Sequence, residues 1–228
     1  MTRLLFVAAF ALMVVGSASA ADFPVPSPPP TYLPEVPLYN WTGVYVGLNG
    51  GGAFGNSNWT DPAFAATGNF SVSGFLLGGT LGANYQAGPW VFGIEGDGDW
   101  TNLDGTTFNT SCAGVGCETS SDFLGTIRGR VGYAWDRLLV YGTAGAAFGD
   151  IQAAAGVLPF MSSTQAGWTA GVGVEYAITP AWSAKVEYLF VDLGSASCGV
   201  GNCGGTTTSV SLNENVFRGG FNYHFGWW

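Results

Sequence analysis

Hydrophobic and polar residues alternate along much of the chain, and this alternation predicts β-strands. Between Val172 and Phe190 the apolar side chains fall on every second position, with Glu175, Lys185 and Glu187 between them. A period of two is that of a strand with two different faces. The pattern breaks at residues 177–180, so the segment is predicted to be a hairpin with one aromatic face and one charged face.

The same alternation predicts eight strands, joined alternately by short and long connections. Short turns follow the second, fourth and sixth strands, and the other connections are long and polar. This arrangement is typical of bacterial transmembrane barrels. The predicted fold class is therefore all-β: an eight-stranded antiparallel up-and-down transmembrane β-barrel with short periplasmic turns and long extracellular loops. The expected strands are Thr42–Phe54, Phe70–Tyr85, Trp90–Trp100, Asp122–Trp135, Leu138–Phe148, Gln165–Tyr176, Trp182–Val191 and Asn215–Phe225.

Aromatic residues gather near both ends of these strands. Trp90 begins the third strand and Trp100 ends it; at roughly 3.3 Å per residue they are about 33 Å apart along the strand. A tilt of ~40° reduces this to about 25 Å, the height of an outer-membrane apolar band. Because Trp and Tyr favour membrane interfaces, we expect two lipid-facing aromatic girdles. Their expected members are Tyr85, Trp90, Trp100, Trp135, Trp168, Tyr176, Trp182, Phe190 and Phe225.

The charged residues alternate with these aromatics and are expected inside the barrel. Only 9% of the chain is charged and 15% is aromatic, whereas soluble domains average about 25% charged residues. We expect Glu95 to approach Arg130, and Asp97 to approach Arg128, across adjacent strands. An eight-stranded barrel is just wide enough for its side chains, which favours a plugged core; a narrow passive channel for small solutes is the alternative. The expected interior network is Glu95, Asp97, Asp99, Arg128, Arg130, Glu175, Lys185, Glu187 and Arg218.

The N-terminus is predicted to be a signal peptide, residues 1–20, followed by a proline-rich periplasmic leader, residues 21–39, and the barrel domain, residues 40–228. A short positive region, a charge-free apolar stretch and a small-x-small end at Ala20 have the form of a secretory signal. In an exported chain, the pairs Cys112/Cys117 and Cys198/Cys203 are expected to form two local disulfides. A four-cysteine zinc site is the weaker alternative, and we expect no metal.

Composition and motifs also narrow the function. The net charge of −9 argues against nucleic acid as a partner. The single histidine, His224, is expected near the short-turn end, and no nucleophile or phosphate-binding motif is present. We therefore expect no enzymatic activity and no cofactor.

Three stretches resemble a known family: "YNWTGVYVGLNGGGAFG", "GWTAGVGVEYAITPAWSAKVEYLFVDLG" and "FRGGFNYHFGWW". They are similar to the small porin-like outer-membrane β-barrel proteins of alphaproteobacteria, relatives of the OmpA/OmpX-like surface-antigen barrels. The resemblance implies localisation in the cell outer membrane and insertion by the outer-membrane assembly machinery. Its C-terminal insertion signal would comprise Phe221, Tyr223, Phe225 and Trp228. The even number of predicted strands places both termini on the short-turn side, in the periplasm.

The expected role is structural, in envelope integrity or surface interaction. The expected partners are outer-membrane lipid and lipopolysaccharide. Any surface ligand would be bound by the exposed loops, which are expected at residues 55–69, 101–121, 149–164 and 194–214.

Overall fold

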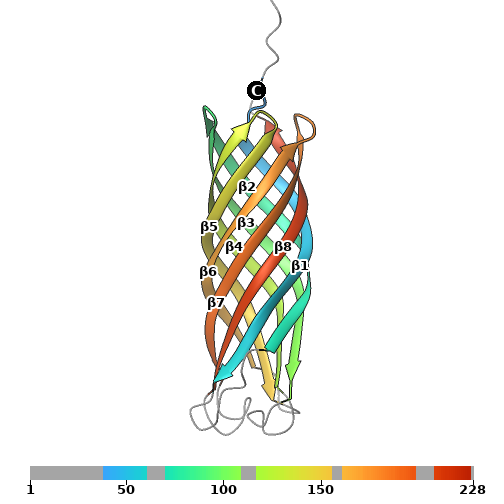
Figure 1. Ribbon diagram of the computed structural model, residues 1–228, viewed down its shortest axis with the longest axis vertical. Coiled ribbons are helices and arrows are strands. Elements are labelled where there is room, and N and C mark those ends of the chain that lie inside the picture. The colour runs from blue at the N-terminus through green and yellow to red at the C-terminus, as the bar shows by residue number, and fades with distance from the viewer. Residues whose placement is uncertain (1–37, 61–69, 109–116, 156–160, 199–207, 227–228) are drawn as a thin grey trace, which may run out of the picture. The chain divides into compact units, whose positions relative to one another are not determined.

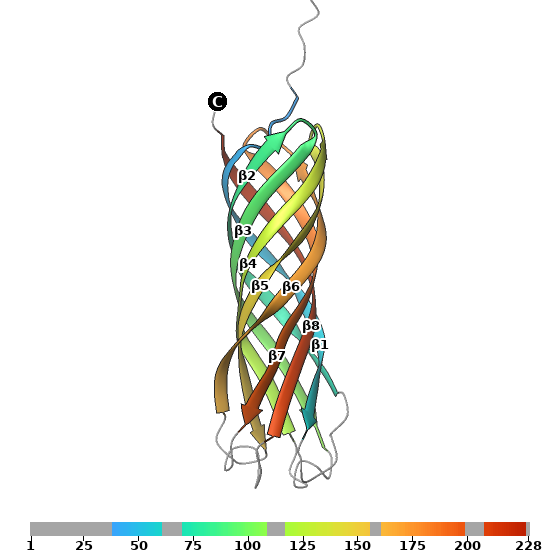
Figure 2. The same ribbon diagram turned by 90° about the vertical axis from the view of Figure 1, so that its left-hand side faces the viewer.

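The computed structural model describes residues 38–60, 70–108, 117–155, 161–198 and 208–226, which form one closed antiparallel barrel (Figures 1 and 2). Each strand pairs with its neighbours in sequence, and β8 closes the sheet by pairing with β1. The predicted fold class is confirmed. The strands are β1 (Gly43–Thr60), β2 (Phe70–Ala87), β3 (Trp90–Thr107), β4 (Cys117–Trp135), β5 (Leu138–Ala155), β6 (Met161–Ala177), β7 (Trp182–Cys198) and β8 (Thr208–Gly226).

Three tight turns lie together at one end of the barrel, called here the short-turn end (top of Figure 1). Gly88, with a φ of 59°, and Pro89 join β2 to β3, and Asp136, with a φ of 53°, and Arg137 join β4 to β5. Positive φ values at these positions are those that two-residue hairpin turns require. Residues 178–181 form the third turn. The opposite end is the loop end.

The aromatic side chains assigned to the two girdles face outward. Trp100 is 74% exposed and Trp168 is 52% exposed towards the loop end, and Trp90 and Trp135 are similarly exposed at the short-turn end. Phe190 faces outward beside Trp168, with the ring centroids 5.4 Å apart. The other residues assigned to the girdles, Tyr85, Tyr176, Trp182 and Phe225, are also exposed.

The strands extend further towards the loop end than the sequence predicted. β3, for example, continues from Trp100 to Thr107, so the expected loops at 55–69, 101–121, 149–164 and 194–214 all begin in strand, and the last three also end in strand. The predicted bounds were wrong because the polarity of the two faces reverses beyond Trp100. Asn102 and Asp104 there face outward, and Leu103 is buried inside. A search for outward apolar residues therefore ends the strand too early.

The register of neighbouring strands also shifts at three places, one of them between Trp100 and Leu103 of β3. In β4 the register shifts between residues 120 and 124, where the Asp150 carboxylate accepts hydrogen bonds from the backbone N–H groups of Asp122 (3.2 Å) and Phe123 (2.9 Å). In β7 the register shifts between Asp192 and Ser195, around Gly194 with its φ of 70°. A bulge adds one residue to one strand, and this breaks the period-two pattern.

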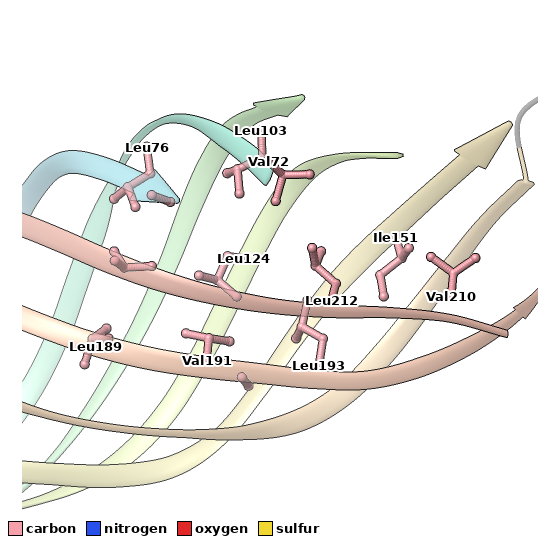
Figure 3. Close-up of a cluster of buried hydrophobic side chains, with 13 residues drawn as sticks. Val72, Leu76, Leu103, Leu124, Ile151, Leu189, Val191, Leu193, Val210 and Leu212 are labelled. Atoms are coloured by element: carbon pink, nitrogen blue, oxygen red, sulfur yellow. The ribbon is translucent and has the colours of Figure 1, made fainter. Parts of the chain in front are cut away.

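Two apolar clusters occupy the two ends of the lumen. The loop-end cluster includes Val72, Leu103, Leu124, Ile151 and Leu212, contributed by strands all around the barrel (Figure 3). The short-turn cluster consists of Trp41, Val91, Ala134, Leu139, Tyr141 and Ala177. On β3, for example, the inward residues Glu95, Asp97 and Asp99 lie between Val91 of the short-turn cluster and Leu103 of the loop-end cluster.

Candidate functional site: the charged interior of the barrel

Five carboxylates and four cations fill the middle of the lumen, because strand alternation directs them inward. None of them is more than 8% exposed. Buried charges are stable only when they are paired and hydrogen-bonded, so their partners decide what this region can do. The members of this charge network are Glu95, Asp97, Asp99, Arg128, Arg130, Glu175, Lys185, Glu187 and Arg218.

Arg128, on β4, contacts carboxylates on two separate parts of the wall. Its Nη2 lies 2.5 Å from Glu95 and 2.6 Å from Asp97, both on the adjacent strand β3. Its Nη1 lies 2.9 Å from Glu187 on β7. Because β7 is not a neighbour of β4 in the closed barrel, this ion pair crosses the lumen.

Arg218, on β8, makes a second crossing. Its guanidinium lies 2.7 Å from Glu187 on the neighbouring strand β7. It also lies 3.0 Å from Asp97 and 2.9 Å from Asp99, both on β3. Arg128 and Arg218 therefore share Asp97 and Glu187, and the four side chains form a continuous charge-assisted network across the lumen.

Arg130 links this centre to the short-turn half of the lumen. It lies 2.7 Å from Glu175 on β6, and its guanidinium stacks 4.0 Å from the centroid of the Tyr141 ring. It also donates a hydrogen bond to the hydroxyl of Tyr45 (2.8 Å), which in turn donates to Glu95 (2.7 Å). The Tyr141 ring thus covers the cation while both of its Nη atoms remain hydrogen-bonded.

All eight strands contribute polar side chains to the network. Thr80 on β2 and Thr126 on β4 each donate a hydrogen bond of 2.8 Å to Asp97. Lys185 on β7 lies 3.0 Å from Glu95. With Tyr45 on β1 and Tyr141 on β5, no strand is left out, so the network ties the whole circumference together.

Ser183, His224 and Glu175 meet at the short-turn side of the network, but not in the geometry of a catalytic relay. Ser183 donates to Glu175 (2.5 Å), and Asn222 donates to the same oxygen, Oε1 (2.7 Å). His224 Nε2 lies 2.8 Å from Ser183 Oγ and 3.4 Å from Glu175. A relay uses the two nitrogens of the imidazole for its two partners. Here one nitrogen faces both partners, beneath the buried side chain of Trp41.

The expected charge pairs are in contact, but their register differs from the expectation. Arg130 lies 3.4 Å from Glu95, and Arg128 lies 2.6 Å from Asp97. In the sheet, however, Glu95 is directly opposite Arg128, and Arg130 is opposite Gly93. The offset is two residues, because tilted strands in a barrel are staggered by its shear. The long arginine side chains span the difference.

Sequence reasoning missed Tyr141, because small residues on both faces left the facing of its strand unassigned. One signal could have found it. The two-residue turn after Trp135 pairs that residue with Leu138, and this register places Tyr141 opposite Gly132. Gly132 lies on the same face of β4 as Arg128 and Arg130.

Several predictions fall outside the described residues. These include the signal peptide, nearly all of the proline-rich leader, Trp228 of the insertion signal, Cys112 and Cys203. The described strands include the backbones of Cys117 and Cys198 but not their side chains. The two disulfides therefore stay predictions. Phe221, Tyr223 and Phe225 all face outward on β8.

Comparisons with known proteins agree with this architecture. Residues 8–225 match a family model described as the outer membrane protein beta-barrel domain. The chain is 34% identical to the 31 kDa outer-membrane immunogenic protein of Brucella melitensis, over 96% of this chain and 98% of that protein. It is 31% identical to the 25 kDa outer-membrane immunogenic protein of the same organism, over 97% of each. Among solved structures, the outer membrane protein OprG of Pseudomonas aeruginosa has the same fold, with a TM-score of 0.52 and 15% identity, over 83% of this chain and 99% of that one.

Proposed function

Because the chain belongs to the outer membrane protein beta-barrel domain family, we propose that it is a structural surface barrel of the outer membrane, closed to solutes. In this role the exposed aromatic residues hold the barrel at the two membrane interfaces. The interior stiffens the wall, and the long connections are presented to the cell exterior.

The burial of the charge network is the observation that supports this proposal. A conducting lumen keeps its charged side chains in water, but here each ion pair of the carboxylates with Arg or Lys has both side chains at 0–1% exposure. The network is also flanked by apolar residues on both sides, Trp41 towards the short turns and Leu103 towards the loops. Ions would have to displace both the salt bridges and these apolar clusters.

The proposal also specifies orientation and partners. The short-turn end faces the periplasm and the loop end faces outward, as in bacterial barrels of this architecture. Outer-membrane lipid and lipopolysaccharide surround the aromatic levels. The assembly machinery recognises the C-terminal aromatic strand, and any surface ligand binds at the loop end. No catalytic role is proposed, because the polar groups at Ser183 and His224 are engaged with Glu175 and buried.

Conductance tests this function. Residues 21–228, the chain without its predicted signal peptide, are refolded in detergent, checked for heat-modifiable gel migration and inserted into a planar bilayer. The closed barrel is expected to give no steady current. Arg128→Ala is the companion variant, since it removes a salt bridge that crosses the lumen. A steady, ion-selective current through the unmodified barrel would overturn the proposal in favour of a narrow passive channel.

A further inference from the structure

Residues Leu38–Thr42 turn across the mouth of the barrel at the short-turn end, and Gly43 is their hinge. This segment, called here the strap, is the blue stretch at the short-turn end in Figure 2. Gly43 has a φ of 147°, a conformation open almost only to glycine, and a Cβ at this position would lie 3.0 Å from the carbonyl oxygen of Phe225. The chain is therefore bent inward at the first residue of β1.

Hydrogen bonds fasten the strap to all three short turns. The backbone N–H of Trp41 donates to Gln86 (2.7 Å), just before the first turn, and its indole N–H donates to the carbonyl of Asp136 (3.1 Å) in the second. The hydroxyl of Tyr39 donates to the carbonyl of Pro180 (3.3 Å) in the third turn. These partners are 45, 95 and 141 residues distant along the chain.

Apolar contacts reinforce these hydrogen bonds. Trp41 is only 1% exposed and lies within the short-turn cluster. Its ring centroid is 4.8 Å from that of Tyr39 and 5.8 Å from that of His224, on β8. The strap therefore covers the group formed by His224, Ser183 and Glu175.

We propose that the strap is a latch that docks after the barrel has closed and then slows its opening. Its partners lie in three separate hairpins and on the last strand, so its binding site is complete only when β8 has joined β1. Ordering a segment against such distant partners before closure would cost entropy with little compensating contact. Contacts that form after the transition state slow unfolding and leave the folding rate nearly unchanged. This inference does not depend on whether the barrel conducts.

Unfolding and refolding kinetics in urea, with residues 21–228 in phospholipid vesicles, test the latch. Trp41→Ala is expected to raise the unfolding rate by more than about 100-fold and Gly43→Ala by about tenfold, while the folding rate of each changes by less than about threefold. Trp41→Phe keeps a ring in the cluster but loses the indole N–H, so a smaller increase in the unfolding rate is expected. This variant replaces Trp41→Ala in the test if Trp41→Ala does not refold. Leu38→Ala is the control, because Leu38 is 78% exposed.

Modification of His224 by diethyl pyrocarbonate provides a second readout. His224 is the single histidine of the chain, so its reaction is observed directly. In barrels that still migrate as folded, Trp41→Ala is expected to react at least tenfold faster than the unmodified protein or Leu38→Ala. Unchanged unfolding rates and unchanged reactivity would overturn the latch. A folding rate that falls by the same factor as the folding equilibrium constant would also overturn it, because the strap would then be part of the folding nucleus.

Discussion

Arg128 forms ion pairs with three carboxylates from two parts of the barrel wall. If Arg128→Ala is made, Glu95, Asp97 and Glu187 each lose a contact of 2.9 Å or less in a region from which water is excluded. Removing one partner of a buried ion pair costs about 3–5 kcal/mol. We expect a loss of this size in the free energy of unfolding, measured by urea titration in vesicles.

Arg137→Ala is the matched control for this prediction. Arg137 lies in a turn and donates only long hydrogen bonds, of 3.4 and 3.3 Å, to backbone carbonyls. A change below about 1 kcal/mol is expected for it, as for other partly exposed charges. Equal losses for Arg128→Ala and Arg137→Ala would show that the network does not stabilise the barrel.

Tyr39 makes the strap sensitive to alkali. Burial raises the pKa of its hydroxyl from 10.0 to about 12; the nearby Glu175 adds to the increase and Arg137 opposes it. Because the folded pKa lies above the unfolded one, the stabilisation is fully present below about pH 10 and is lost as the pH rises through 12. We expect the unfolding rate to increase across this window more steeply than in Tyr39→Phe. Parallel profiles for the two proteins would contradict this assignment.

The facing of individual residues was readable from the sequence, but their partners were not. Alternation alone placed Glu95, Asp97, Arg128 and Arg130 inside. The direct pairing of Glu95 with Arg128 depends on barrel shear, which the alternation of one strand does not encode. The position of Trp41 was also beyond reach, because it is fixed by hydrogen bonds to Gln86 and Asp136, which are distant in sequence.

At the scale of the strand, inward and outward glycines have different reasons to be present. In β5, a Cβ on the inward-facing Gly145 would overlap the backbone of β4 at Ile127 and Arg128, whereas a Cβ on the outward-facing Gly142 would have no contact closer than 3.9 Å. The narrow, curved barrel thus brings neighbouring backbone close to inward positions. Outward positions remain open.

A pair of substitutions in β5 tests this difference. Gly145→Ala is expected to lower the free energy of unfolding by about 1–3 kcal/mol, because overpacking shifts the backbone of the neighbouring strand. Gly142→Ala makes the same chemical change in the same strand and is expected to alter stability by less than about 0.5 kcal/mol. Equal changes in the free energy of unfolding, measured by urea titration, would mean that strand propensity rather than packing determines the cost of these substitutions.

The two ends of the strands were not equally predictable. The starts of β3, β5 and β7 at Trp90, Leu138 and Trp182 agree with the sequence prediction, because tight turns and apolar alternation coincide there. The loop-end bounds were several residues short. Beyond the aromatic level the apolar residues move to the inside, and bulges at 120–124 and 192–195 shift the period.

For the whole molecule, the fold class followed from the number of alternating segments and the regular alternation of short and long connections. The separation of the lumen into two apolar clusters with charges between them could not be predicted from the sequence. It depends on which side chains from all eight strands reach the same height, and that is set by tilt and closure together. The conductance experiment tests the consequence of this layering for transport.

The reversal of polarity beyond Trp100 fixes how deep the barrel can sit. Moving it along the membrane normal towards its short-turn end would bring Asn102 and Asp104 into hydrocarbon, and moving it the opposite way would place the aromatic side chains of the loop end in water. Both displacements are unfavourable, so the barrel fits a bilayer of one hydrophobic thickness. Where the bilayer is thicker or thinner than the apolar band, the bilayer deforms and the barrel keeps its depth. A barrel of this kind acts as a ruler for the membrane around it: lipids of matching length should gather at its surface, and bilayers that are too thick or too thin should exclude it.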